Sequence, residues 1–277
     1  MSFLNAILTA KRDEIARAKA QLPHAQIERL AAARRDSPRG FAAALDAPGV
    51  RVIAELKRAS PSRGDIRADL DPAATACAYA DGGAAALSVL TEPAFFKGST
   101  ADLRQARDAT PLPVLRKDFI IDPYQVYESA ALHADAILLI VRILDDDTLH
   151  ALYTLARSLG LDVLTEVFDA HDAARARALG ATPVGINNRD LDRFETDVTH
   201  AARLAACLSP GTAVVALSGI RSLDDIRQTL AGGIRRFLVG ETLVRQPDPA
   251  ATLRTWTSLP IHTLSVESSS SFLTPHS

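Results

Sequence analysis

Apolar and polar positions recur with a helical period through the first part of the chain. Residues 3–22 place apolar side chains three and four positions apart with charged residues between them, which predicts an amphipathic helix. A second helical piece follows Pro23, and a third surrounds Phe41 to Leu45 and ends before Pro48-Gly49. A helical leader covering about residues 1–48 therefore precedes any predicted strand.

From Val52 onward, short apolar runs alternate with longer helical stretches. The run from Ala136 to Val141 is apolar on both faces, as expected of a parallel strand covered by helices. Asp71-Pro72 and Ser222 are typical helix caps. The predicted strands are 51–56, 85–90, 113–117, 135–141, 161–166, 183–187, 213–217 and 235–240, and the predicted helices are 72–81, 100–109, 123–132, 145–159, 170–179, 197–208, 222–231 and 248–256.

Eight strand-plus-helix units in one series predict a (β/α)8 TIM barrel with an extra N-terminal helical segment. The competing architecture is a doubly wound open sheet. That sheet would need a glycine-rich turn after its first strand to bind a nucleotide, whereas this chain has Lys57-Arg58-Ala59-Ser60-Pro61 there. We expect residues 1–256 to form one barrel domain that includes the leader, and the serine- and threonine-rich tail 257–277 to be disordered.

Composition narrows the classes of partner. The formal net charge is -2, which does not favour binding to nucleic acid or to an anionic membrane surface. The chain has neither a run of about 18 apolar residues that could span a bilayer nor a signal peptide, so a cytoplasmic protein is expected. Cys77 and Cys207 are predicted to be small core residues. The histidines lack metal-ligand spacing, so no metal site is predicted.

Charged residues stand at the end of the first predicted strand. Glu55 and Lys57 are two positions apart, so they project from the same face. Charges on an inward face are costly unless they pair with each other or with a ligand. Taken alone, the two could be a structural ion pair. The following residues, Ser60 to Gly64, are predicted to form a polar loop.

Two further charged residues end other strands of the series. In a barrel, the carboxyl ends of the strands carry the chemistry, and Lys117 and Glu166 stand at such ends. Lysines flanked by carboxylates keep their protons and can act as general acids. A desolvated glutamate can act as a base. Together with Glu55 and Lys57, these residues predict acid–base catalysis.

Neutral and aromatic residues add recognition groups. Asn187 can hydrogen-bond to a ligand, and Arg189 offers a planar fork for a carboxylate or a hydroxyl. Phe95, Phe96 and Phe119 could form an apolar slot for an aromatic ring, although each alone is more often plain packing.

The last two strand ends contain glycine. Ser218-Gly219 and Gly240-Glu241 stand where the final helices begin. Glycine lets an anion approach backbone N–H groups, and this region of a barrel commonly holds a phosphate. The alternative is that these glycines only make tight turns. Lys57, on the neighbouring first strand, could reach the same anion. The residues thus indicate an enzyme for a small phosphorylated substrate that carries a ring and a carbonyl or carboxylate group.

An ordered set of motifs resembles the indole-3-glycerol phosphate synthase family. The resemblance covers nearly the whole chain except the tail, and the leader matches an N-terminal segment that helps to cover the active site in that family. The motifs are Glu55-Leu56-Lys57-Arg58-Ala59-Ser60-Pro61-Ser62, Leu90-Thr91-Glu92, Phe96-Lys97-Gly98-Ser99, Arg116-Lys117-Asp118-Phe119, Thr165-Glu166-Val167, Asn187-Asn188-Arg189-Asp190-Leu191 and Ser218-Gly219-Ile220.

The resemblance implies a reaction of tryptophan biosynthesis on 1-(2-carboxyphenylamino)-1-deoxyribulose 5-phosphate, without a cofactor. By similarity, Lys117 protonates the ketone, Glu166 is the base or proton relay, Lys57 holds anionic groups and assists dehydration, and Glu55 orients the lysines and contacts the substrate amine. The implied substrate-binding residues are Ser60, Phe96, Phe119, Asn187, Arg189, Leu191, Ser218, Gly219, Gly240 and Glu241.

One position departs from the family pattern. Leu217 stands where the family usually has a glutamate before Ser218-Gly219. This change motivates an alternative, a barrel that binds a phosphorylated ligand without turnover or prefers another substrate. A third reading, phosphoribosylanthranilate isomerase, is disfavoured because that family lacks the leader and uses a cysteine and an aspartate in place of Lys117 and Glu166. A monomer is the simplest expectation, with association to other pathway enzymes left open.

Overall fold

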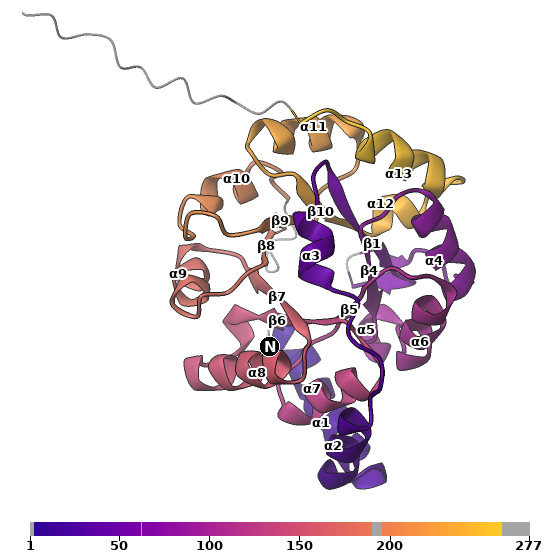
Figure 1. Ribbon diagram of the computed structural model, residues 1–277, viewed down its shortest axis with the longest axis vertical. Coiled ribbons are helices and arrows are strands. Elements are labelled where there is room, and N and C mark those ends of the chain that lie inside the picture. Colours follow the sequence, from indigo (N-terminus) through magenta and orange to yellow (C-terminus); the bar gives the residue numbers. More distant parts are fainter. Residues whose placement is uncertain (1–2, 62, 190–195, 262–277) are drawn as a thin grey trace, which may run out of the picture.

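Eight parallel strands close into a barrel, as the sequence predicts (Figure 1). The computed structural model describes residues 3–61, 63–189 and 196–261. Strand β1 pairs with β4 on one side and with β10 on the other, which closes the ring. The strands are β1 (Arg51–Leu56), β4 (Ala86–Leu90), β5 (Val114–Lys117), β6 (Ala136–Ile140), β7 (Asp162–Val167), β8 (Val184–Asn187), β9 (Val214–Leu217) and β10 (Arg236–Val239).

Helices follow the strands and cover the outside of the ring. Side chains predicted to cap them do so: Asp71, for example, accepts a hydrogen bond from the backbone N–H of Ala74. Only the helix predicted at 197–208 is much shorter in the structure. The outer helices are α4 (Pro72–Asp81), α6 (Thr100–Ala109), α7 (Pro123–Ala131), α8 (Asp146–Ser158), α9 (Ala170–Ala178), α10 (His200–Ala205), α11 (Leu223–Ala231) and α13 (Pro249–Thr257).

Several short elements were not predicted. A small antiparallel hairpin joins Ala59–Ser60 (β2) to Gly64–Asp65 (β3) where the sequence suggested only a loop. The other additions are α5 (Pro93–Phe96), the 3-10 turn η1 (Val141–Ile143) and α12 (Glu241–Val244).

Three predictions outside the barrel strands concern the cysteines, membrane-spanning helices and the tail. Cys77 is exposed and Cys207 is half-buried, so the prediction that both are core residues was wrong, because Cys77 lies on the solvent side of α4. Among the described residues, no helix is long and apolar enough to cross a membrane. Of the predicted disordered tail, residues 262–277 lie outside the described residues, and α13 itself extends to Thr257.

The leader reaches both ends of the barrel. It consists of α1 (Phe3–Gln21), α2 (His24–Ala32) and α3 (Phe41–Asp46). Helix α3 lies across the middle of the ring in Figure 1, and its Phe41 and Leu45 are fully buried with Ile53 in the barrel interior. The amino ends of the strands are therefore closed by α3, which leaves the carboxyl ends for a site.

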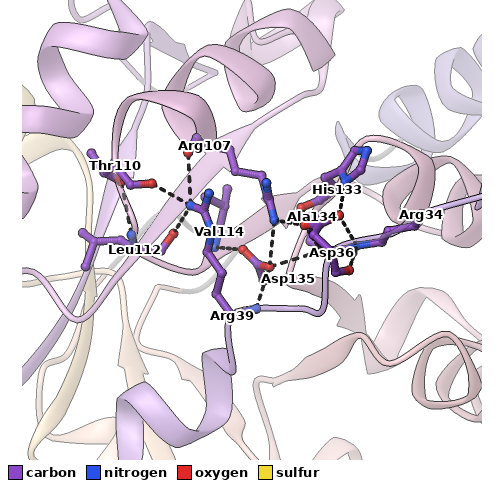
Figure 2. A network of polar contacts seen from close by, with 10 residues as sticks. All are labelled: Arg34, Asp36, Arg39, Arg107, Thr110, Leu112, Val114, His133, Ala134 and Asp135. Carbon is purple, nitrogen blue, oxygen red and sulfur yellow. Dashed lines mark hydrogen bonds and ion pairs between the residues drawn. The ribbon is translucent and has the colours of Figure 1, made fainter.

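A polar network fixes the connection between α2 and α3 (Figure 2). The carboxylate of Asp135, just before β6, accepts hydrogen bonds from the backbone N–H groups of Arg39 and Val114. The Arg39 guanidinium donates to the carbonyl oxygens of Thr110 and Leu112, at 2.6 and 2.9 Å. These contacts tie the leader to the amino ends of β5 and β6.

The inward side chains change character along the barrel axis. Apolar residues such as Ile53, Leu115 and Leu164 fill the lower part of the interior. Two residues further along β1, β5 and β7, the inward positions carry Glu55, Lys117 and Glu166 instead. The same alternation that packs the core therefore lifts charged groups into the open end of the barrel.

Candidate active site

A cavity of about 350 Å³ opens at the carboxyl ends of the strands and adjoins a smaller one of about 130 Å³. This size suits a small ligand. Residues common to both cavities are Lys57, Lys117, Glu166, Asn187, Arg189 and Ser218. The structure thus brings together residues at or just after the carboxyl ends of β1, β5, β7, β8 and β9 that the sequence predicted at one site.

Glu55 and Lys57 form the first charged pair. The Glu55 carboxylate is 4% exposed, lies 3.6 Å from the Lys57 ammonium and accepts a hydrogen bond from the hydroxyl of Ser88 at 3.4 Å. Burial lowers the pKa of Lys57 below that of an ordinary lysine, while Glu55 opposes this and nearby Lys117 adds to it. Lys57 is thus a desolvated cation next to the cavity, ready to pair with an anion.

Lys117 and Glu166 form the second pair, across the barrel mouth. Their charged atoms lie 3.8 Å apart. The side-chain amide of Asn187 donates to Glu166 Oε1 at 3.0 Å, and its Oδ1 accepts from the backbone N–H of Arg189. Glu166 Oε2 is buried and accepts no hydrogen bond from the residues that the structure describes. One oxygen of this carboxylate is fixed, and the other faces Lys117.

The predicted phosphate end lies at β9 and β10. An ideal Cβ on Gly240 would lie 2.5 Å from Glu55 Oε1, and one on Gly219 would lie 2.6 Å from Thr196 Cγ2. Gly219 also has a φ of +88°, so it requires glycine for its backbone as well as for space. Gly219 therefore does make a tight turn. Both Gly219 and Gly240 also line the larger cavity, where an anion could lie beside their backbone.

Sequence reasoning missed three cations at this end. Arg63, Arg221 and Arg245 line the larger cavity. Glu241 pairs with two of them, at 3.6 Å from Arg63 and 3.3 Å from Arg245. Arg221 could have been found from the sequence, because it comes three residues after Ser218 of the predicted phosphate end.

The smaller cavity forms the predicted aromatic end. The rings of Phe96 and Phe119 lie 6.2 Å apart and are tilted by 38°. The Lys57 ammonium lies 5.6 Å from the centre of the Phe96 ring. The hydroxyl of Ser60 is buried there and has no hydrogen-bond partner among the described residues. Phe95, also suggested for this slot, does not line either cavity.

The leader contributes residues that the sequence did not predict for the site. Leu4 and Ile7 of α1 line the smaller cavity. They looked like ordinary core positions of an amphipathic helix, and nothing local distinguished them. Leu191, expected at the site, lies outside the described residues.

Leu217 occupies the last inward position of β9. It is 2% exposed and lies level with Asn187 of β8 in the parallel register. An ideal Cβ on Gly185 would lie 2.7 Å from Leu217 Cδ1, so the leucine fills the space that this glycine leaves. Leu217 thus forms an apolar floor beside the charged pairs.

Solved structures share the fold at low sequence identity. The thiamine phosphate pyrophosphorylase from Pyrococcus furiosus superposes with a TM-score of 0.57, at 17% identity, over 75% of this chain and 93% of that chain. KGPDC from Streptococcus mutans gives a TM-score of 0.58, at 14% identity, over 76% and 96% of the two chains. These similarities support the barrel fold alone.

Sequence relatives are much closer. A family model described as indole-3-glycerol phosphate synthase matches residues 4–256. The indole-3-glycerol phosphate synthase of Desulfosudis oleivorans is 51% identical, over 91% of this chain and 97% of the relative. The one of Rhodopirellula baltica is 49% identical, over 90% and 96%. The predicted resemblance is confirmed, and this chain belongs to the indole-3-glycerol phosphate synthase family.

Proposed function

We propose that this chain converts 1-(2-carboxyphenylamino)-1-deoxyribulose 5-phosphate into indole-3-glycerol phosphate. The observation that carries the proposal is a cavity with two unlike ends. A glycine-lined, arginine-rich end suits a phosphate, and an aromatic end with Phe96 and Phe119 suits a ring. The two lysine–glutamate pairs lie between these ends, where the sugar ketone would be.

Binding would place the substrate across both cavities. Ser218, Gly219 and Gly240 hold the phosphate, with Arg221 and Lys57 as the neighbouring positive charges. The ring stacks near Phe96 and Phe119. Asn187 and Arg189 make polar contacts between the two ends, Ser60 does so at the aromatic end and Glu241 at the phosphate end. Leu191 stays a prediction from the family pattern.

Ring closure needs an acid at the ketone. Lys117 donates a proton to the ketone oxygen while the ring carbon that bears the carboxylate attacks the ketone carbon. The electron pair left when carbon dioxide departs restores the aromatic ring. Glu166 lies 3.8 Å from the Lys117 ammonium and can orient it toward the ketone oxygen for this step.

Dehydration then removes the new hydroxyl group. Lys57 supplies a proton so that the hydroxyl leaves as water, and Glu166 accepts a proton from the CH₂ group next to the nitrogen, which forms the carbon–carbon double bond. Glu55 orients Lys57 and contacts the substrate amine. These acids, bases and cations carry out a sequence with no net oxidation or reduction.

The test is product formation by the purified chain. Indole absorbance and fluorescence should appear on mixing with the substrate, and Lys117→Ala should lower turnover by about 100-fold or more, the lower range for a general acid. Lys19→Ala is the control, because Lys19 is a half-exposed lysine that pairs with Asp122 outside the cavity. Tight substrate binding without product would refute the synthase proposal and favour a barrel that only binds the ligand. The cytoplasmic location, the monomeric state and the single domain over residues 1–256 stay predictions.

A further inference from the structure

One face of α1 joins the cavity to a buried charge. Leu4, Ile7 and Lys11 are three and four residues apart, so they follow one another along the same side of the helix. The first two line the smaller cavity. Lys11, about one turn further, is 1% exposed. A lysine is almost never this buried without a specific partner.

The partner of Lys11 is Asp118, immediately after the proposed acid Lys117. The Lys11 ammonium lies 2.8 Å from Asp118 Oδ1, and the aspartate side chain is fully buried. Glu14, on the next turn of α1, accepts a second hydrogen bond from Lys11 at 2.7 Å. Desolvating these charges is costly, so a helix that only covered the barrel would pack more easily with an apolar side chain here.

Asp118 is also the centre of contacts within the barrel. Its Oδ2 accepts hydrogen bonds from the hydroxyl of Thr91 at 2.6 Å and from the Arg116 guanidinium at 3.1 Å, and its Oδ1 accepts from the backbone N–H of Phe119 at 2.8 Å. Burial alone would raise the pKa of Asp118, but the charges of Arg116 and Lys11 outweigh it and lower the pKa to about 2. Asp118 is therefore a carboxylate that both cations hold in place.

This arrangement brackets Lys117. Side chains alternate along β5, so Arg116 and Asp118 point out of the barrel and into the network while Lys117 points into the cavity. Both chain neighbours of Lys117 are thus anchored, and the anchored N–H of Phe119 sets the start of the aromatic end. Among the described residues, Lys11 is the leader residue that pairs directly with Asp118.

We propose that Lys11 is a positioning residue: its buried ion pair with Asp118 holds the end of β5 so that Lys117 and Phe119 meet the substrate correctly only when α1 is seated. This inference rests on the proposed function, and it gives the leader a role in the chemistry besides covering the cavity. A shift of about 1 Å in an acid can cost roughly 100-fold in rate.

The test compares Lys11→Met with Lys19→Met in the full chain. Both lysines are on α1, and both pair with an aspartate after β5, but the Lys19–Asp122 pair is half-exposed and remote from the cavity. We expect Lys11→Met to lower kcat by about 10-fold to 100-fold, measured well below its unfolding temperature. Binding of inorganic phosphate by calorimetry should change little, because the phosphate end belongs to β9 and β10. Lys11→Arg should recover part of kcat, and Lys19→Met should match the parent.

Three outcomes would overturn the inference. The first is parent-like kcat in Lys11→Met, and the second is an equal loss in Lys19→Met. If Lys11→Met does not fold, Lys11→Met/Asp118→Asn removes both charges of the pair and should fold with kcat still lowered by about 10-fold or more. The third outcome that would overturn the inference is parent-like turnover in this double variant. Absence of product from the parent itself would refute the proposed function as well, which separates the two failures.

Discussion

Gly240→Ala tests whether the position of Glu55 matters for turnover. Gly240 has a φ of −117°, so it does not lie in the left-handed region that favours glycine. The expected effect comes from the space that an added side chain needs. An added Cβ would lie 2.5 Å from Glu55 Oε1 and 3.2 Å from both Cβ and Cδ of the same residue.

The magnitude follows from these distances. Ordinary contacts to a Cβ begin at about 3.4 Å, so the Glu55 carboxylate must move by roughly 1 Å. Glu55 is 4% exposed and accepts a hydrogen bond from the Ser88 hydroxyl, so this move disturbs a buried contact. We expect a loss of about 1–3 kcal/mol in the free energy of unfolding, as for other overpacked sites. Because the move changes the Glu55–Lys57 pair, kcat/KM should fall by about 10-fold to 100-fold.

The assay pairs indole production with thermal unfolding. Gly233→Ala is the matched control. Gly233 has a φ of +83° and open space at its Cβ, and it lies in the turn before β10, at the opposite end of the barrel. It should lose about 1 kcal/mol of stability through backbone strain while kcat/KM stays near the parent value. Stability loss alone would then be separated from displacement of Glu55.

A second substitution sharpens the test. Glu55→Asp shortens the side chain by one methylene, so in the Gly240→Ala background it should relieve the contact and cost less stability than it does alone. Normal kcat/KM in Gly240→Ala would refute the reasoning. Additive stability losses in the double variant would show that Glu55 and residue 240 do not compete for the same space.

The remaining predictions concern charge and packing. On the alkaline side, kcat/KM should fall at a pH below the pKa of an ordinary lysine, because burial and neighbouring cations lower the pKa of Lys57. Glu55→Gln should move this fall to still lower pH, because it removes the carboxylate that opposes the shift. Gly185→Ala should cost about 1–3 kcal/mol by its contact with Leu217, and adding Leu217→Ala should recover part of this, as measured by chemical unfolding. Burial alone would raise the pKa of Asp36, but its histidine and arginine partners lower it, so its stabilisation is present above an ordinary carboxyl pKa and lost as pH falls. Asp36→Asn should therefore unfold more easily near neutral pH but lose less stability on acidification.

The barrel could be predicted because each strand and helix has a signal in residues that are close in sequence. Apolar runs such as Ala136–Ile140 and caps such as Asp71 and Ser222 depend on residues close in sequence, and the structure keeps most of their bounds within one or two residues. Strand ends could then be combined into a site, since parallel strands of a barrel share one carboxyl end. Glu55, Lys57, Lys117 and Glu166 meet for this reason.

The missed features all depend on contacts between distant segments. Ile7 and Lys11 look like a core residue and a surface lysine of an amphipathic helix until α1 is placed beside β5. Arg63 reaches the cavity because the β2–β3 hairpin folds back toward Glu241. Cys77 has a small side chain in an alanine-rich helix, so its sequence environment does not say which side faces solvent. Local sequence patterns determine where each helix or strand forms, but contacts with neighbouring elements determine which of its sides is buried.

Leu217 changes the charge of the site more than its shape. The leucine fills the space above Gly185, so the floor of the cavity is closed without a polar group. Among the described residues that line the larger cavity, six carry positive charge and three, Glu55, Glu166 and Glu241, carry negative charge. A glutamate at 217 would cancel part of that excess, whereas leucine preserves it for a substrate that carries both a phosphate and a carboxylate. Because Glu55 and Glu166 already pair with Lys57 and Lys117, the proposed proton transfers do not require a third carboxylate at this position.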